Sequence, residues 1–222
     1  MNHPGPVVIT GASRGIGREA ALRFARGGSD LVLTFRQGRD AAAELAEECR
    51  RLGAGQVWPR ELDLADPAGI EGFARELLAR HGRIRVLVNN AGMIVWGPLP
   101  GQSREDVLRQ IATNLTGPIL LTRALLPHVG TVLNVASDLS RFGMADLTVY
   151  CATKFGLRGF TQAFAAEHPE VRVLCVNPDR TATGMNDFQG RDPAVAGEVI
   201  WKAAEGFYDV PNGGDVDVWE VL

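Results

Sequence analysis

Short apolar runs alternate with longer amphipathic segments along this chain, and this alternation limits the possible folds more than any other feature. The runs are Val7–Ile9, Leu31–Phe35, Gln56–Trp58 leading to Glu61–Leu64, Val86–Val88, Thr131–Val135, Val171–Val176 and an alternating Val216–Val221. Helices are predicted over 18–27, 39–52, 67–81, 103–127, 148–167 and 192–205. Apolar strands bounded by helices are typical of a buried parallel sheet. We predict one α/β domain over residues 1–222: a doubly wound, mostly parallel seven-stranded sheet with helices on both faces.

The composition excludes several functional classes. Hydrophobic residues make up 45% and charged residues 22% of the 222 residues, as in ordinary soluble proteins. The net charge of -3 offers no basic surface for nucleic acid. The three cysteines are far apart, so neither a disulfide framework nor a metal site is expected. Neither a signal peptide nor a run of membrane length is recognised, which predicts a cytoplasmic protein with no membrane partner.

A glycine-rich turn follows the first apolar run. Its sequence is Thr10-Gly11-Ala12-Ser13-Arg14-Gly15-Ile16-Gly17. A strand, a glycine turn and a helix present unpaired backbone N–H groups and a helix N-terminus, which favour a phosphate. The spacing differs from G-x-G-x-x-G, and residues 11–15 also match the G-x-S-x-G turn of hydrolases. From the turn alone, a phosphate site, a nucleophilic serine and a plain turn all stay open.

Tyr150 and Lys154 are four residues apart in a predicted helix, so their side chains lie on one face. A neighbouring ammonium favours the phenolate and is expected to lower the pKa of the tyrosine, which suits a proton donor or acceptor. An isolated pair of this kind is also consistent with an ordinary amphipathic helix.

Four motifs in one order resemble those of the short-chain dehydrogenase/reductase family. They are the glycine turn, Asn89-Asn90-Ala91-Gly92, Ser137, and Tyr150 with Lys154. The resemblance runs from about Val7 to Met185 and implies a Rossmann-like fold. The hydrolase alternative needs a histidine in a late loop, whereas His81, His128 and His168 lie near predicted helix ends.

The resemblance implies which residues bind the cofactor and which react. The cofactor-binding residues are Gly11, Ser13, Arg14, Gly15, Ile16, Gly17, Arg36, Asp63, Leu64, Asn90, Ala91, Gly92, Tyr150, Lys154, Pro178, Thr181 and Thr183, with Asp63 at the adenine. The catalytic residues are Asn114, Ser137, Tyr150 and Lys154. By resemblance, Ser137 and Tyr150 hold a carbonyl, and Tyr150 gives its proton to the developing alkoxide. Lys154 holds the ribose of the nicotinamide, and Asn114 anchors a water.

The end of the second predicted strand indicates which cofactor is preferred. An acidic residue there would bind the ribose 2′-hydroxyl of NAD(H). Thr34-Phe35-Arg36 has none, and Arg36 with Arg14 suits a 2′-phosphate. We predict NADP(H), with NAD(H) as a possible second cofactor.

Two departures from the family pattern stand near the substrate. Asp179 replaces the usual glycine after Asn177-Pro178, and the segment after Thr183 is short, with an abbreviated C-terminal end. The residues expected at the substrate are Ile94, Trp96, Asp138, Met144, Asp179 and Phe188. This mixture favours a small apolar or aromatic carbonyl compound, or its alcohol in reverse.

The sequence therefore predicts an NADPH-dependent carbonyl reductase that forms a homo-oligomer, either a dimer or a tetramer. The alternative is a regulatory or structural protein that binds NADP and has lost turnover. The complete set of four catalytic residue types argues against that alternative.

Overall fold

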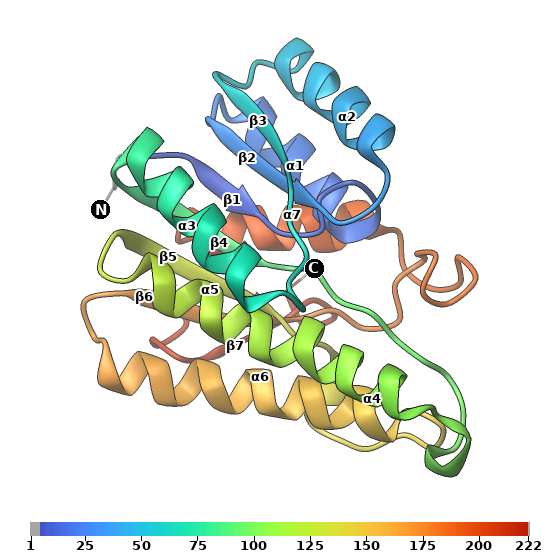
Figure 1. Ribbon diagram of the computed structural model, residues 1–222. Helices are drawn as coiled ribbons and strands as arrows, with labels where there is room; N and C mark the ends of the chain where they lie inside the picture. The colour runs from blue at the N-terminus through green and yellow to red at the C-terminus, as the bar shows by residue number, and fades with distance from the viewer. Residues whose placement is uncertain (1–4, 222) are drawn as a thin grey trace.

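A computed structural model of the chain describes residues 5–221 (Figure 1). Within them, one seven-stranded sheet has the order β3-β2-β1-β4-β5-β6-β7, and every pairing is parallel. The strands are β1 (Val7–Ile9), β2 (Leu31–Phe35), β3 (Val57–Glu61), β4 (Ile84–Asn89), β5 (Val129–Val135), β6 (Arg172–Asn177) and β7 (Asp215–Asp217). The predicted doubly wound α/β fold is confirmed.

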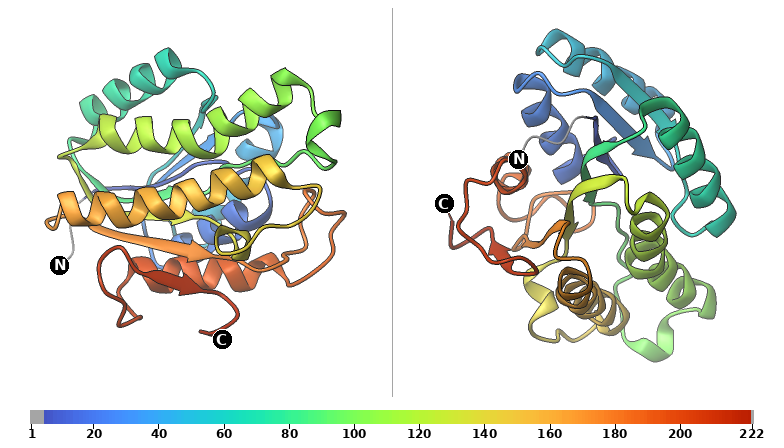
Figure 2. Two further views of the ribbon diagram at one scale, coloured as in Figure 1. Left: turned by 90° about the horizontal axis from the view of Figure 1, so that it is seen from below. Right: turned by 90° about the vertical axis from the view of Figure 1, so that its left-hand side faces the viewer.

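Helices cover both faces of the sheet (Figure 2). They are α1 (Gly15–Arg26), α2 (Arg39–Arg51), α3 (Pro67–His81), α4 (Arg104–Ile111), α5 (Gly117–Leu125), α6 (Thr148–Glu167) and α7 (Pro193–Ala204). Apolar residues of α1, α2 and α7 pack on one face of the sheet, and those of α3, α5 and α6 pack on the other. Each face thus has its own hydrophobic core, so the strands are apolar on both sides.

Three predicted boundaries were wrong. The helix expected over 103–127 is interrupted by a π-helical turn, Ala112–Thr116, between α4 and α5. The strand ends at Glu61: the N–H of Leu62 still donates to the Phe35 carbonyl of β2 at 2.8 Å, and Asp63 then accepts a hydrogen bond from the N–H of Ala65 in the turn that follows. The strand expected over 216–221 is β7, which spans only Asp215–Asp217. No helix within residues 5–221 combines the length and the apolar character needed to cross a membrane.

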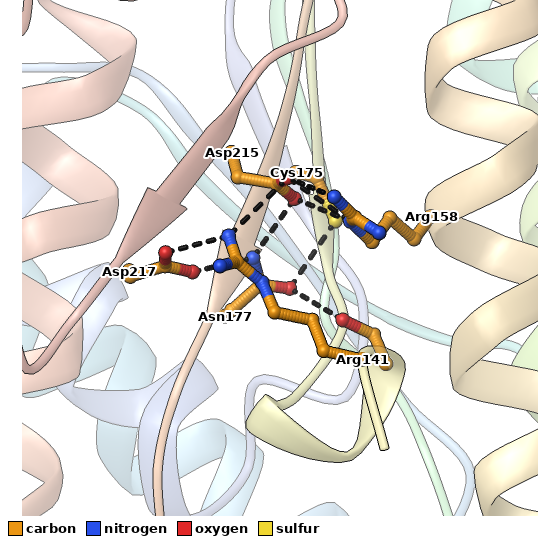
Figure 3. Close-up of polar contacts among 7 residues, drawn as sticks. Arg141, Arg158, Cys175, Asn177, Asp215 and Asp217 are labelled. Atoms are coloured by element: carbon orange, nitrogen blue, oxygen red, sulfur yellow. Dashed lines mark hydrogen bonds and ion pairs between the residues drawn. The ribbon is translucent and has the colours of Figure 1, made fainter.

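A polar network joins β7 to the rest of the molecule (Figure 3). Arg158 of α6 binds both carboxylate oxygens of Asp215, at 2.7–3.0 Å. Arg141 pairs with Asp217 at 2.6 Å, and Asn177 of β6 donates hydrogen bonds to Asp215 and Asp217. The short edge strand is therefore held by charged side chains as well as by its backbone.

Asp215 makes the stability of this edge depend on pH. Burial raises the pKa of its carboxyl, but hydrogen bonds from Arg158 and Asn177 outweigh burial and hold the pKa below its usual value. A lowered pKa in the folded state stabilises the fold above the pKa of the unfolded chain, and this contribution is lost as the pH falls through the folded value.

We expect Asp215→Asn to lower the free energy of unfolding by about 1–3 kcal/mol at pH 7, because Arg158 loses its charged partner. Urea unfolding at neutral and acidic pH measures this. The deficit should shrink as the pH falls, since protonated Asp215 also loses its charge. The exposed Asp209 provides the control, and Asp209→Asn should change stability little. A deficit independent of pH would contradict this account.

Candidate active site

The carboxyl ends of β1 and β4 are tied together by one threonine. The hydroxyl of Thr10 accepts hydrogen bonds from the backbone N–H groups of Asn90 and Ala91, each at 3.0 Å. The side chain of Asn90 donates in return to the carbonyl oxygens of Thr10 (2.8 Å) and Gly11 (3.3 Å). The strand order reverses between these two strands, which is where open α/β sheets bind ligands.

The conformation and the close packing of the glycine turn leave no room for side chains at Gly11 and Gly17. Gly11 and Gly15 have φ values of 64° and 58°, which favour glycine. A Cβ on Gly11 would lie 2.8 Å from the Cα of Ala91. A Cβ on Gly17 would lie 2.6 Å from the carbonyl oxygen of Gly11. The turn therefore packs backbone against backbone at the start of α1.

The N-terminus of α1 fits a phosphate group. Among the residues described, no side chain caps this helix, and its first turn carries no acid. Its first N–H groups are thus available to an anion, and the helix dipole favours negative charge. Ser13 and Ile16 are partly buried, whereas Arg14 and Arg36 are exposed. Neither arginine forms an ion pair within residues 5–221, so both remain available for a further phosphate.

Asn114 is buried in the π-helical turn between α4 and α5. Its Oδ1 accepts from the N–H of Met93, and its Nδ2 donates to the Met93 carbonyl, each at 2.8 Å. A further hydrogen bond, at 3.2 Å, reaches Thr153 of α6. The π turn places this side chain between α6 and the loop after Gly92, and such turns are frequent at functional sites.

Lys154 lies on α6 behind Tyr150, with its Nζ 5.5 Å from the centre of the tyrosine ring. Its ammonium is buried and donates to the Val135 carbonyl at 2.9 Å. Burial lowers the pKa of Lys154 to about 8. The predicted shared face is confirmed.

The predicted lowering of the Tyr150 pKa was wrong for the protein alone. Burial raises this pKa to about 12, the neighbouring hydroxyl of Ser137 acts in the opposite direction, and the charge of Asp138 raises the pKa further. Withdrawal of the phenolate from water is the largest of these effects. Tyr150 is consequently protonated at neutral pH, as a proton donor must be.

Ser137 follows β5 and begins a short 3₁₀ helix, Asp138–Ser140. Its hydroxyl donates to Oδ1 of Asp138 at 2.7 Å and accepts from the N–H of Leu139 at 3.2 Å. Pro178 contacts the same segment, because its carbonyl accepts from the N–H of Asp138 at 2.9 Å. The serine, the tyrosine and the loop after β6 thus meet at one place.

The loop after β6 is closed at its base by Asp179. Both carboxylate oxygens of Asp179 accept hydrogen bonds from Arg191, at 2.8–3.2 Å. Thr181 is buried beside Arg191 in an isolated β-bridge. The methyl group of Thr183 would lie 3.2 Å from a Cβ on Gly15, so this loop also borders the glycine turn. The substrate role predicted for Asp179 stays a prediction, since Arg191 occupies the carboxylate here.

The predicted adenine contact is engaged in other bonds. Arg109 of α4 donates to Oδ2 of Asp63 at 2.5 Å, and the N–H of Ala65 occupies Oδ1 at 2.9 Å. Leu64 is buried, and its carbonyl oxygen would lie 2.5 Å from a Cβ on Gly117. The roles of Asp63 and Leu64 toward a cofactor therefore stay predictions.

Four of the residues predicted at the substrate are apolar: Ile94, Trp96, Met144 and Phe188. Ile94 and Tyr150 both pack against the small buried cluster of Leu139, Leu147 and Cys151. Trp96 and Met144 are exposed, and the indole N–H of Trp96 donates to the Met185 carbonyl at 3.2 Å. Phe188 is 75% exposed with a φ of 58°. The hydrogen bond from Trp96 to Met185 joins the loop after β4 to the loop after β6. The side chain of Phe188, in contrast, is largely in solvent.

Residues 6–194 match the family of short chain dehydrogenases. The chain belongs to the short-chain dehydrogenase/reductase family. It is 33% identical to the short-chain dehydrogenase/reductase FrzI of Cladobotryum sp. over 88% of this chain and 78% of that one. It is 34% identical to 11-beta-hydroxysteroid dehydrogenase-like 4A of Arabidopsis thaliana over 80% of this chain, but spans only 61% of that protein.

A solved family structure covers nearly the whole chain. A metagenomic short-chain oxidoreductase in complex with NADP has 32% identity and a TM-score of 0.85, over 97% of this chain and 96% of that one. The family assignment agrees with the resemblance found in the motifs, and the relatives named here are dehydrogenases, reductases or oxidoreductases.

Three residues of this short-chain dehydrogenase site went unrecognised in the sequence. Thr10 binds the loop after β4, Thr153 binds Asn114, and Arg191 neutralises Asp179. Thr10 begins the glycine turn and Thr153 lies between Tyr150 and Lys154. Their positions within these two motifs could have identified them. Arg191 carries no such signal, because it lies twelve residues after Asp179 and only the folded loop brings the two side chains together.

The glycine turn of this family member can be tested with two glycines that both lie in helices. Gly17→Ala should lower the free energy of unfolding by about 1–3 kcal/mol, because its Cβ meets backbone. Gly159 of α6 has open space around it, so Gly159→Ala should raise stability by about 0.5–1 kcal/mol. Urea unfolding of both variants provides the measurement. Equal effects in the two would refute the tight packing.

Proposed function

We propose that this protein is an NADPH-dependent reductase that converts a ketone or aldehyde into an alcohol. The observation that carries the proposal is the meeting of Ser137, Tyr150, Lys154 and Asn114 beside the loop after β4. Gly92 marks the place: a Cβ there would lie 3.5 Å from Oδ1 of Asn114 and 3.8 Å from Nζ of Lys154. The amide and the ammonium therefore border one site, and the ring of Tyr150 lies 5.5 Å from that ammonium.

Each of the four residues has a separate role in the proposed reduction. The nicotinamide, when bound, supplies the hydride. Ser137 and Tyr150 hold the carbonyl oxygen, and the Tyr150 hydroxyl delivers its proton to that oxygen as negative charge develops there. Lys154 lies behind the tyrosine and would bind the nicotinamide ribose, and Asn114 would anchor the water that restores the proton.

Support for NADP(H) comes from both the site and a neighbour. The exposed Arg14 and Arg36 border the glycine turn and the end of β2, where an acid would be expected for NAD(H). The similar metagenomic oxidoreductase was solved with NADP. The apolar side chains predicted at the substrate favour a small apolar substrate.

A cytoplasmic location stays a prediction from the sequence.

We further propose a homo-oligomer built on α4 and α6. Leu108 and Ile111 of α4 and Phe155 of α6 are apolar and exposed. Exposed apolar side chains on adjacent helices favour association between copies. The choice between dimer and tetramer stays open.

Tyr150→Phe should lower kcat for NADPH-dependent ketone reduction by about 100-fold or more, because the proton donor is removed. The other tyrosine provides the control, so Tyr208→Phe should leave turnover unchanged. The decrease in NADPH absorbance with a panel of ketones and aldehydes measures the turnover of both variants. Undiminished turnover by Tyr150→Phe would refute the mechanism. Tight NADPH binding without oxidation by any panel member would favour a catalytically silent protein.

Arg36→Ala should raise the KM for NADPH about 10-fold or more and change that for NADH little, because a charge-assisted bond to the 2′-phosphate is lost. Arg39, three residues along, pairs with Glu61 at 2.7 Å and serves as the control. Arg39→Ala should keep the coenzyme preference. A wild-type protein that prefers NADH would contradict the proposal for the cofactor.

A further inference from the structure

The carboxylate of Asp138 is only half engaged by the protein. Its Oδ1 accepts the hydroxyl of Ser137 at 2.7 Å and the N–H of Leu139 at 2.8 Å. No residue within 5–221 donates a hydrogen bond to its other oxygen, Oδ2. The side chain is partly exposed, so this oxygen is available to a ligand beside the catalytic serine.

Two cationic side chains close to Asp138 in the sequence or in the proposed site, Arg141 and Lys154, are bound to other partners. Arg141, three residues along, directs its guanidinium to Asp217 at 2.6 Å and Asp215 at 3.3 Å (Figure 3). Lys154 donates to the Val135 carbonyl. No ion pair within residues 5–221 reaches Asp138. Its negative charge therefore stays uncompensated at the edge of the site.

The serine hydroxyl has two competing acceptors. A hydroxyl carries a single proton, and here Ser137 gives it to Asp138. Donation to a substrate carbonyl requires that proton to leave the carboxylate, which is a strong acceptor. A substrate with a hydrogen-bond donor that reaches Asp138 replaces the hydrogen bond that Ser137 withdraws. A substrate without such a donor leaves the carboxylate with one hydrogen bond fewer.

We propose that Asp138 selects carbonyl substrates that carry a hydroxyl or amino group on the carbon next to the carbonyl. The arrangement fits this class, since the Ser137 hydroxyl and the Asp138 carboxylate are adjacent and joined by one hydrogen bond, and an α-hydroxy ketone presents its carbonyl oxygen and its hydroxyl on adjacent carbons. The apolar remainder of the substrate faces side chains such as Trp96 and Met144. This inference rests on the proposed reductase activity.

Two ketones that differ only in the neighbouring hydroxyl test the proposal. The wild-type protein should reduce α-hydroxyacetophenone with a kcat/KM about 10-fold or more above that for acetophenone, the factor expected for a hydrogen bond to a charged group. Asp138→Ala should bring the ratio close to one. Asp138→Asn keeps the shape and one acceptor oxygen, so it should give an intermediate ratio.

Asp146, an exposed acid on the same segment, provides the matched control. It has a φ of 64°, which asparagine also tolerates, so Asp146→Asn should keep the wild-type preference. Equal kcat/KM values for the two ketones in the wild type, or an unchanged ratio in Asp138→Ala, would overturn the proposal.

Binding of the corresponding alcohols separates this proposal from the proposed activity. Calorimetry should show that the wild type binds styrene glycol more tightly than α-methylbenzyl alcohol, and that Asp138→Ala and not Asp146→Asn loses this preference. The preference without turnover of either ketone would refute the reductase and support the role of Asp138. Turnover of both ketones with no preference in binding or rate would refute the role of Asp138 alone.

Discussion

The hydrogen bonds made by Thr10 hold together the place on which this site depends. Its hydroxyl accepts the N–H groups of Asn90 and Ala91, and the amide of Asn90 returns bonds to the turn. These bonds lock the end of β1 to the end of β4, where the strand order reverses. The glycine turn and the loop that carries Gly92 consequently keep one relative position, and the catalytic side chains are arranged around it.

Burial of polar groups gives the site its chemistry. Lys154 and Asn114 are almost fully enclosed, and each is hydrogen-bonded to backbone: Lys154 to the Val135 carbonyl and Asn114 to both polar groups of Met93. Such bonds offset the unfavourable transfer of polar groups from water. The same burial lowers the pKa of Lys154 to about 8 and raises that of Tyr150 to about 12. In the protein alone, the tyrosine is thus a neutral donor.

Three acids near the site differ in how their charge is balanced. Asp179 is held by Arg191, and Asp217 is held by Arg141 and Asn177. Asp138 has no cationic partner within the described residues and draws the proton of Ser137 toward itself. Asp179 therefore holds the loop after β6 and Asp217 holds the edge strand β7, whereas Asp138 is the acid for which we propose a contact with the substrate.

The sequence by itself determined the sheet, its helices and the positions of the glycine turn and of Ser137, Tyr150 and Lys154. These features depend on local periodicity and on motifs of fixed spacing, which neighbouring residues set. Only the tertiary structure decided that Asn114 lies in a π turn, that Arg191 closes on Asp179, and that Tyr150 has a raised pKa. Those outcomes depend on burial and on contacts between segments distant along the chain, because solvent exclusion and charge pairing arise only when the helices pack on the sheet.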